Sequence, residues 1–338
     1  MTKARFLALS LFAMALPLGA QAQEAGPQVA ASITYEEVER PEGLPEEFAA
    51  TDATQLSFLK LTAIDGNPID AALWRPAEGD ADTIVVSIHG SGGNYTYNPV
   101  GPLSMNLATA GTSVLAINTR QSGDKVNTDN FFDVTNDIDA AVQTARALGF
   151  ENIVLHGQSL GNIQVQYYAA THWSPDIKGV VLTSMFGDLP WKSRHILMQN
   201  EENYADLVAA AEQYLHEGKA GEVLPMEMSW LGGDSSPVTA QHFLTYRDTE
   251  IGTAVGVYWI KRVPYPMLLV RDGGDAIIND FEPYMLLSAA TSEGSLVPSI
   301  DYKLLPNENG TSSAGHGFSQ NKEPLAETVS GWIDGLGL

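Results

Sequence analysis

The chain has 338 residues, a formal net charge of −23 and no cysteine. The lack of cysteine excludes disulfide bonds, thiolate nucleophiles and zinc–thiolate sites. The negative charge opposes binding to nucleic acid and to anionic membranes, so neither is expected as a partner. A chain of this length can bury a large hydrophobic core without covalent cross-links.

The first 22 residues have the pattern of a secretory signal peptide. Lys3 and Arg5 precede an apolar run at 6–18, and Ala20-Gln21-Ala22 supplies the small residues of a cleavage site. We therefore predict a periplasmic or secreted protein that is cleaved near Ala22. The apolar run is too short to cross a membrane, and no later segment is long enough, so no membrane span is expected.

Alternating strand and helix patterns begin at residue 53, after a stretch at 23–52 that is predicted to form a loosely attached N-terminal arm. Asp65-Gly66-Asn67 joins two β-like runs, which indicates a hairpin. Apolar strands separated by helices predict an α/β fold with a mostly parallel central sheet flanked by helices, and the hairpin at its antiparallel edge. The predicted strands are 55–63, 68–75, 83–88, 113–117, 152–155, 179–183, 267–270 and 300–304, and the predicted helices are 102–110, 134–148, 160–173, 280–291 and 324–336.

One connection breaks this alternation. About eighty residues separate the sixth predicted strand from the seventh, far more than a usual loop. They include a helical run at 202–217 and many aromatic and methionine residues. We predict a core at 53–185 and 263–338, interrupted by a helical cap or lid at 186–262. Most large side chains of the cap are expected to form its own small core, and only a few to line a pocket.

The run Gly157-Gln158-Ser159-Leu160-Gly161 has the layout of a nucleophile elbow. An apolar strand precedes it and a helical pattern follows, so that a sharp, strained turn pushes the Ser159 hydroxyl clear of the sheet. Glycine is needed at both ends because a Cβ there would collide with neighbouring backbone. The alternative is a Gly-Ser turn in a structural loop, which the flanking strand and helix disfavour.

A nucleophilic serine needs a base within hydrogen-bond reach. Of the seven histidines, His89 and His156 stand at strand ends beside glycines and fit structural roles. His316 is the predicted base, because it follows the last strand in a run, 313–318, that we expect to be a flexible loop. Glycines on both sides of His316 would let the imidazole reach inward.

The base in turn needs an orienting acid, and the loop after strand 267–270 offers two. Asp275 stands just before an apolar pair and is the predicted partner of His316. Asp272 lies directly at the strand end and is the alternative, although a turn-forming role suits it equally. Either choice gives the chain order Ser, Asp, His.

Acyl transfer also requires donors for an oxyanion. The amide of Leu160, directly after the serine, is one candidate. The other is expected in the loop His89-Gly90-Ser91-Gly92-Gly93, with the Ser91 amide preferred and Gly90 next. A phosphate-binding role for this loop is excluded because no Gly-Lys-Ser/Thr follows.

Together these motifs resemble the α/β-hydrolase fold superfamily over nearly all of the chain from about residue 55, with a cap inserted after the sixth strand. The matching positions are the glycine-rich loop at 89–93, the elbow at 157–161, Asp275 and His316. Gln158 and Asn162 depart from the commonest residues of the elbow. The resemblance implies a serine hydrolase that works through an acyl-enzyme, with no cofactor and no metal.

The predicted activity is hydrolysis of a carboxylic ester or lactone, a small molecule with a bulky apolar or aromatic part. Gly90, Met185 and Trp191 are predicted to contact the substrate. Arg120, after the fourth strand, and Arg194, in the cap, are candidate partners for a substrate carboxylate, with a surface role as the alternative for each. A peptidase or amidase is the alternative enzyme, and a non-catalytic ligand-binding protein on the same scaffold is the alternative outside enzymes. No obligate protein partner is indicated.

Overall fold

The computed structural model describes residues 35–79, 82–198, 201–229 and 235–338. By internal contacts the chain divides into Met1–Ser32 and Ile33–Leu338, and all described residues belong to the second unit. The predicted signal peptide therefore lies outside the described residues. No helix among the described residues is long and apolar enough to cross a membrane.

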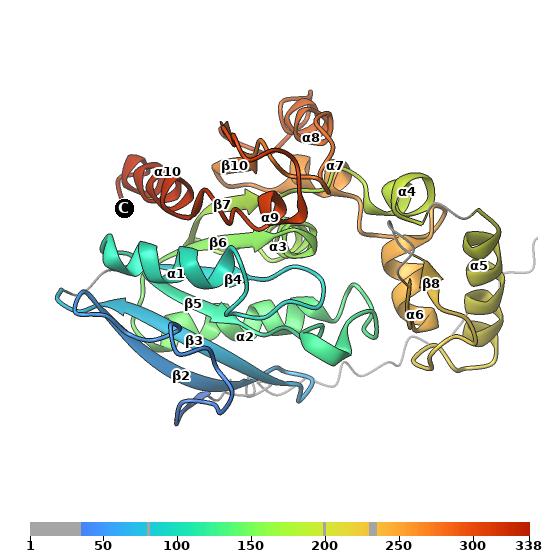
Figure 1. Cartoon of the computed structure of the whole chain (residues 1–338), viewed down its shortest axis with the longest axis horizontal. Coiled ribbons are helices and arrows are strands. Elements are labelled where there is room, and N and C mark those ends of the chain that lie inside the picture. Colours follow the sequence, from blue (N-terminus) through green and yellow to red (C-terminus); the bar gives the residue numbers. More distant parts are fainter. Residues whose placement is uncertain (1–34, 80–81, 199–200, 230–234) are drawn as a thin grey trace, which may run out of the picture. The chain divides into compact units, whose positions relative to one another are not determined.

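Nine strands in the described part of the chain form one twisted sheet in the order β1-β2-β3-β5-β4-β6-β7-β10-β11 (Figure 1). The edge strands β1, β2 and β3 are antiparallel, whereas β5, β4, β6, β7, β10 and β11 run parallel. This arrangement confirms the predicted mostly parallel sheet with a hairpin at its edge. The strands are β1 (Tyr35–Val38), β2 (Thr54–Thr62), β3 (Pro68–Pro76), β4 (Thr83–Ile88), β5 (Ser113–Ile117), β6 (Asn152–Gln158), β7 (Ile177–Thr183), β10 (Met267–Asp272) and β11 (Ile300–Leu305).

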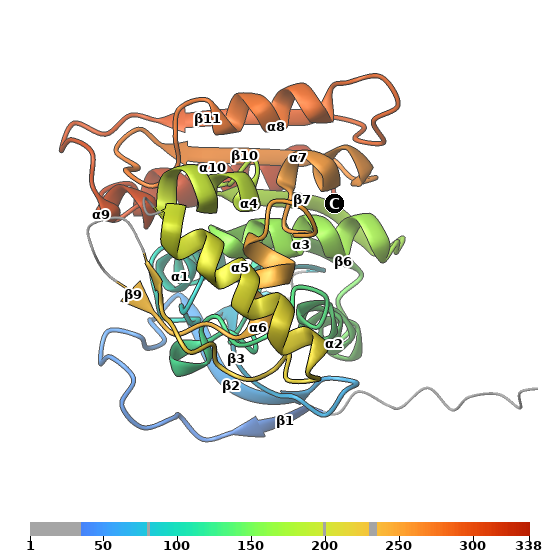
Figure 2. The same ribbon diagram turned by 90° about the vertical axis from the view of Figure 1, so that its right-hand side faces the viewer.

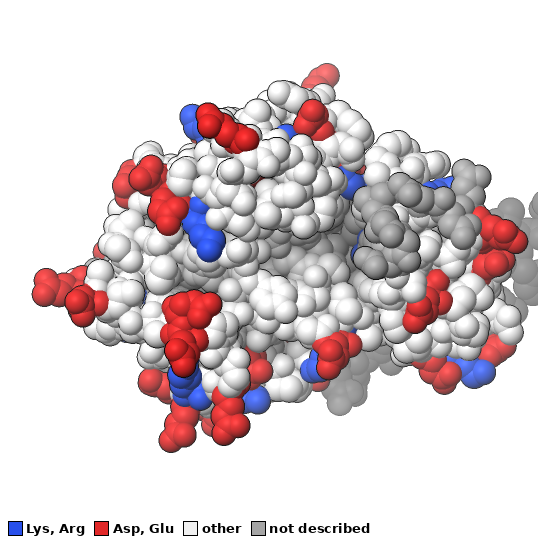
Figure 3. All heavy atoms as spheres, viewed as in Figure 1, with Lys and Arg blue, Asp and Glu red and all other residues white. Residues whose placement is uncertain are grey.

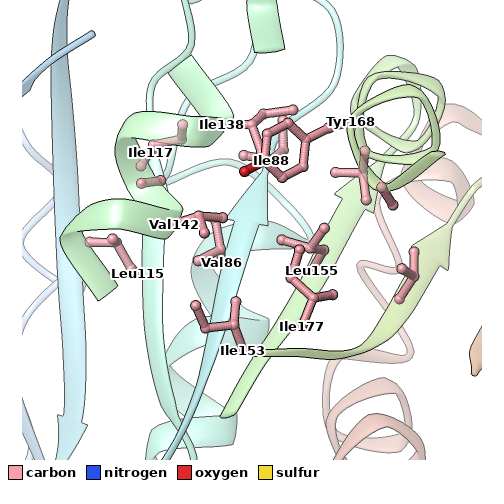
Figure 4. Packing of buried hydrophobic residues seen from close by; sticks show 14 of the residues in the cluster. Val86, Ile88, Leu115, Ile117, Ile138, Val142, Ile153, Leu155, Tyr168 and Ile177 are labelled. Carbon is pink, nitrogen blue, oxygen red and sulfur yellow. The ribbon is translucent and has the colours of Figure 1, made fainter. Parts of the chain in front are cut away.

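Helices cover both faces of the sheet because side chains along each strand point alternately to opposite faces. In β4, Val86 and Ile88 pack with α2 and α3, whereas Val85 packs with α1 and α10. Figure 4 shows the first of these layers, in which strand residues meet Ile138 and Tyr168 from the helices. The helices that flank the sheet are α1 (Val100–Thr109), α2 (Val134–Ala147), α3 (Leu160–Thr171), α8 (Glu282–Ala290) and α10 (Lys322–Gly335), with short turns at η1 (Gly123–Lys125) and α9 (Ser313–His316).

The N-terminal stretch corrects one expectation. Residues 35–52 are not a loosely attached arm, because β1 pairs with β2 and Phe48 is buried. The Phe48 ring packs edge-on against Trp74, with centroids 5.3 Å apart, and stacks on Tyr95 at 5.6 Å. The polar composition of the segment gives little sign of this contact, because Phe48 is the one buried residue within 35–52.

Residues 184–266 form a long insertion between β7 and β10, which we call the insertion. Its own small core gathers Met198, Tyr204, Leu207, Met228 and Phe243. Other large side chains of the insertion, such as Phe186 and Tyr246, pack instead in a cluster with residues of α3. Figure 2 shows α5 and α6 of the insertion facing the viewer, in front of the sheet. Its elements are α4 (Leu189–Lys192), η2 (Ser193–Leu197), α5 (Glu201–His216), β8 (Met228–Ser229), β9 (Ser235–Ser236), α6 (Ala240–His242), η4 (Phe243–Arg247), α7 (Gly256–Trp259) and η5 (Ile260–Arg262).

Candidate active site

The site begins where β4 and β6 end side by side. These neighbouring parallel strands are in register at Ile88 and Gly157, so the loop after β4 and the turn after β6 start next to each other. The order of the sheet reverses at this point, since β5 lies on one side of β4 and β6 on the other. Open α/β sheets bind ligands at such switch points, beyond the carboxyl ends of the strands.

The turn at Ser159 is strained in the way that an elbow requires. Ser159 has φ 52° and ψ −118°, a backbone conformation that costs free energy for a residue other than glycine. A Cβ at Gly157 would lie 2.5 Å from the Gly161 carbonyl oxygen, and a Cβ at Gly161 would lie 2.6 Å from the His89 carbonyl oxygen. Both glycines are therefore needed for close backbone approach.

The three predicted triad side chains lie in one hydrogen-bonded row. The Ser159 hydroxyl lies 2.9 Å from His316 Nε2, and His316 Nδ1 lies 3.0 Å from Asp275 Oδ2. With the proton of the neutral ring on Nδ1, the imidazole donates to the carboxylate and accepts from the serine. This is the arrangement in which a histidine can remove the serine proton.

Asp275 is the acid that reaches His316, and Asp272 is not. The Asp272 carboxylate accepts hydrogen bonds from the Gly274 amide at 2.7 Å and from the side chains of Asn307 and Asn321, both at 2.8 Å. It thus ties the loop after β10 to the loop after β11. Its position at the strand end suits this turn-forming role.

The charge of the Asp275 carboxylate is stabilised although only 2% of the residue is exposed. Burial acts to raise the pKa of Asp275, but the hydrogen bond and charge of His316 and the amides of Ile278 and Ile277 together hold it below the usual range. Those two amides donate to Asp275 Oδ1 at 3.0 and 2.8 Å. The carboxylate is therefore held ionised and in a fixed orientation.

The segment that carries His316 corrects a second expectation. It is the short helix α9 and not a flexible loop. A Cβ at Gly315 would overlap the Gly274 carbonyl, and a Cβ at Gly317 would lie 3.1 Å from Asn98 Cβ. The Ser184 hydroxyl also donates to the His316 carbonyl oxygen at 2.7 Å. The glycines permit close packing, which positions the imidazole without any need for mobility.

The glycine-rich loop after β4 lies directly against the serine. A Cβ at Gly90 would lie 2.8 Å from Ser159 Cβ and 2.5 Å from Gln158 Oε1. The buried His89 ring holds this loop in place. Its Nδ1 lies 2.6 Å from the Gly90 carbonyl oxygen, and its Nε2 accepts from the Thr119 amide at 3.0 Å. Burial lowers the pKa of His89 to about 4, so its ring is neutral at neutral pH. The structural role predicted for His89 fits these contacts.

A cavity of about 440 Å³ opens beside Ser159 and His316. The loop after β4, the start of α3 and the insertion all contribute to its wall. Figure 3 shows a hollow near the centre of one face, bordered largely by uncharged residues, with Asp and Glu mostly toward the edges. The residues that line the cavity are His89, Gly90, Ser91, Gly93, Tyr97, Asn98, Val100, Gln158, Ser159, Leu160, Phe186, Leu189, Leu197, Arg247, Ile277 and His316.

Of the residues predicted to contact a substrate, Gly90 lines the cavity together with both predicted oxyanion residues, Ser91 and Leu160. Four others do not line it, and their placement corrects the prediction. Arg120 is held in ion pairs with the buried Asp137 at 2.7 Å and with Asp65 at 2.8 Å. Met185 is fully buried in the main core, and Trp191 lies 42% exposed beside His195 and Phe281. Arg194 is exposed, with its guanidinium over the Tyr204 ring.

Several lining residues were missed by the sequence-based reasoning. Ile277 had a usable signal, because it follows the predicted acid by two positions. Leu189, Leu197 and Arg247 carry no local motif, since their approach to the cavity depends on how the insertion folds back. Among the described residues, no group of three or more His, Asp or Glu side chains could hold a metal ion.

A sequence profile of the family described as "protein of unknown function (DUF1749)" matches residues 75–252, more than half of the chain. The chain belongs to this family. The matched range contains the glycine-rich loop and the elbow and ends inside the insertion, before Asp275 and His316. No functionally curated protein matches the sequence.

Solved structures establish the fold of this family member as that of the α/β hydrolases. Est1E from Butyrivibrio proteoclasticus with bound ferulic acid has a TM-score of 0.59 at 17% identity, covering 80% of this chain and 95% of its own. A thermostable carboxyl esterase from Bacillus coagulans has a TM-score of 0.59 at 15% identity, covering 85% and 100%. The esterase domain of a Rhodothermus marinus protein has a TM-score of 0.54 at 19% identity, covering 82% and 97%. The predicted fold, a mostly parallel sheet flanked by helices as in the α/β hydrolases, is thereby confirmed.

Proposed function

We propose that this protein is a serine hydrolase that cleaves carboxylic esters or lactones. The observation that carries the proposal is the hydrogen-bonded row from Ser159 through His316 to the buried Asp275. The neighbouring esterases named above share the fold and are consistent with this activity. The close approach of the Gly90 backbone to Ser159 supports it further, because an oxyanion-binding loop must lie beside the nucleophile.

In the proposed mechanism Ser159 Oγ attacks the ester carbonyl carbon while His316 Nε2 takes the hydroxyl proton. Asp275 stabilises the imidazolium that forms. The oxyanion is bound by the amides of Ser91 and Leu160, the latter at the first turn of α3, where backbone N–H groups have no partner within the helix. His316 then returns the proton to the leaving alcohol, and water releases the acid from the acyl-enzyme by the same steps.

The proposed substrates are small esters with a moderately bulky apolar or aromatic part. Phe186, Leu189, Leu197 and Ile277 supply apolar wall to the cavity beside Ser159. The first three come from the insertion, which we propose acts as a cap over the serine. We further propose that residues 1–22 direct the protein to the periplasm or outside the cell.

The direct test is the Ser159→Ala variant assayed with a panel of 4-nitrophenyl esters of graded acyl length. Turnover should fall to the background rate, because Ser159 carries the one hydroxyl among the described residues that lies within hydrogen-bond distance of His316 Nε2. Ser184→Ala is the matched control, since Ser184 is a second buried serine with positive φ beside His316. It loses only the hydrogen bond to the His316 carbonyl oxygen and keeps the three triad side chains, so it should retain measurable activity.

A fluorophosphonate probe separates the proposal from a non-catalytic binding role. The wild type and Ser184→Ala should be labelled, and Ser159→Ala should not. Unchanged ester turnover in Ser159→Ala, or an unlabelled wild type, would refute the assignment of the nucleophile. Aminoacyl 4-nitroanilides assayed beside the esters test the amidase alternative, for which we expect much slower turnover.

A further inference from the structure

Gln158, the last residue of β6, brings a buried amide side chain to the wall of the candidate active-site cavity. It directly precedes Ser159, lines the same cavity and is only 6% exposed. Its side-chain amide makes no hydrogen bond to any other residue that the structure describes. A buried polar group without a partner costs free energy, so the position of this amide calls for a physical reason.

The other buried polar side chains of this wall are bonded within the protein. Those of His89, Ser159 and Arg247 each make at least one hydrogen bond to another residue. A buried glutamine outside the cavity lining is bonded as well, since Gln164 Nε2 on α3 donates to a tyrosine hydroxyl at 3.1 Å. The Gln158 amide therefore differs from its neighbours in having its hydrogen-bonding groups left for a ligand.

The chemistry of a side-chain amide selects a particular kind of ligand group. Its oxygen accepts hydrogen bonds and its nitrogen donates them, and it carries no charge. A hydroxyl group both donates and accepts, so it can pair with either end of the amide, whereas a carboxylate can only accept. Phe186, Leu189 and Ile277 supply apolar wall to the same cavity. In such surroundings a ligand without the hydroxyl would leave the amide unpaired, at a cost in binding.

The position of the amide indicates which part of an ester it meets. In the proposed mechanism His316 returns the proton to the leaving alcohol, so the alcohol part lies on the His316 side of Ser159. A Cβ at Gly90 would lie 2.5 Å from Gln158 Oε1, so the amide lies against the loop proposed to bind the oxyanion. The acyl part is therefore the part beside the amide. Because Gln158 and Ser159 are adjacent, the contact falls close to the carbonyl carbon.

We propose that Gln158 is a specificity-determining residue whose side-chain amide binds a hydroxyl group on the acyl part of the substrate, close to the scissile carbonyl. The preferred substrates are then hydroxyacyl esters. This inference rests on the proposed ester hydrolysis and narrows its substrate class. It also gives a physical reason for the departure of Gln158 from the commonest residues at its position in the elbow.

The test compares matched esters in which a hydroxyl group takes the place of a methyl group. Ethyl lactate and ethyl 2-methylpropanoate differ in this way at the carbon next to the carbonyl. Ethyl 3-hydroxybutanoate and ethyl 3-methylbutanoate differ one carbon further along, and the enantiomers of each hydroxy ester are assayed separately. Each kcat/KM is divided by the rate of alkaline hydrolysis of the same ester, which removes the difference in intrinsic reactivity.

We expect the wild type to prefer the hydroxyl member of at least one pair. In Gln158→Met, which keeps a side chain of similar length without the amide, that preference should fall by about 10–100-fold, mainly through loss on the hydroxyl member. Gln158→Asn keeps a shortened amide and should fall in between. Gln164→Met is the matched control, because it removes the amide of a buried glutamine outside the cavity lining. Its preference should equal that of the wild type.

A wild type that prefers the hydroxyl member of neither pair overturns the inference and leaves the proposed function intact. The same holds for a preference that is unchanged in Gln158→Met, for an equal loss on both members, and for a wild type active on the 4-nitrophenyl panel but on none of the four esters. A wild type inactive on all four esters and on the panel refutes the proposed function itself. If Gln158→Met does not fold, the wild-type preference and Gln158→Asn decide the question.

Discussion

The core loops and the insertion line one cavity, but the two regions are constrained in different ways. In the core, Gly90, Gly157 and Gly161 each lack room for a Cβ because other backbone or the serine itself lies against them. In the insertion, Leu197 and Arg247 line the cavity from the ends of η2 and η4. Leu197 packs in a cluster with Leu160 of α3, and η4 contributes Phe243 to the insertion's own small core. Backbone geometry fixes the first region, and side-chain packing fixes the second.

This difference separates the type of reaction from the choice of substrate. A residue whose Cβ would meet a backbone atom cannot change without moving Ser159, the proposed nucleophile, so the core loops are expected to tolerate little variation. A side chain on the insertion can change its size or charge while the fold around Ser159 stays the same. We therefore expect variants in the core loops to abolish turnover, and variants in the insertion to alter which esters are cleaved or how firmly the insertion is held.

The largest loss of kcat in this comparison should distinguish the two acids, Asp275 and Asp272, at the end of β10 and in the loop after it. In Asp275→Asn the imidazole loses the carboxylate that fixes its orientation and stabilises its charged form, so kcat should fall by about 10³–10⁴-fold. In Asp272→Asn the same chemical change removes only acceptors for Gly274, Asn307 and Asn321, and the loss of kcat should be much smaller. Steady-state kinetics on one 4-nitrophenyl ester, beside thermal unfolding of each variant, would measure both.

Equal losses of kcat in the two variants, with both folded, would contradict the assignment of Asp275. They would also remove the distinction between chemical and structural roles within this loop. Because Asp275 and Asp272 are three residues apart and both buried, the pair controls for the cost of neutralising a buried acid.

The sequence was sufficient to locate the residues whose chemistry depends on local backbone. Ser159 stands in a motif that is typical of a strained strand-to-helix turn, and its φ of 52° agrees with that prediction. Asp275 was preferred over Asp272, and its contact with His316 agrees with that preference. The six parallel strands were predicted to within a few residues for the same reason, since buried parallel strands read as continuous apolar runs, whereas β1 was not predicted. Local pattern and tertiary structure agree wherever the backbone itself is the constraint.

The sequence was insufficient where contacts between distant segments decide. Phe48 looks like one aromatic residue in a polar stretch, and only the fold shows that it packs on Trp74. Arg120 and Arg247 are indistinguishable by local sequence. The first is neutralised by Asp137 and Asp65, and the second faces the cavity, because of where α2 and η4 come to lie.

The next largest effect is expected on stability, when a buried ion pair that joins the insertion to the core is broken. Lys192 Nζ, on α4, contacts Glu282 on α8 and donates to the Ile277 carbonyl oxygen at 2.5 Å and to Asn279 Oδ1 at 3.0 Å. Lys192→Met leaves the Glu282 carboxylate buried without its cation, so the free energy of unfolding should decrease by about 3–5 kcal/mol. Urea denaturation at neutral pH measures this change.

The double variant Lys192→Met with Glu282→Leu should recover most of the lost stability, because no uncompensated charge then remains buried. Lys219→Met is the matched control, since the Lys219–Glu217 pair at 2.7 Å is exposed and its loss should not change stability measurably. A Lys192→Met variant as stable as the wild type would show that this pair does not hold the insertion to the core.

The smallest expected effect is a loss of stability at low pH, and buried histidines in the core and in the insertion should differ in it. Burial lowers the pKa of His89 to about 4 and that of His156 to about 3 in the core. In the insertion, burial also lowers the pKa of His242, but Asp129 opposes the shift. Histidines in the unfolded chain have a pKa of about 6.5, so below about pH 6.5 the unfolded chain binds protons that the buried core histidines do not bind. The free energy of unfolding must therefore decrease as the pH falls. From pH 7 to pH 5 the free energy of unfolding should fall by roughly 2 kcal/mol for each core histidine.

Urea denaturation at the two pH values measures this dependence. The His156→Gln variant removes the contribution of one core histidine, and His216→Gln, at an exposed position, is the control. Because His156 is sandwiched between Ser87 and Thr183 at 2.7 and 2.9 Å, a glutamine can keep hydrogen bonds there without a group that titrates. A pH dependence of stability that is the same in His156→Gln as in the wild type would contradict the neutral state of this ring.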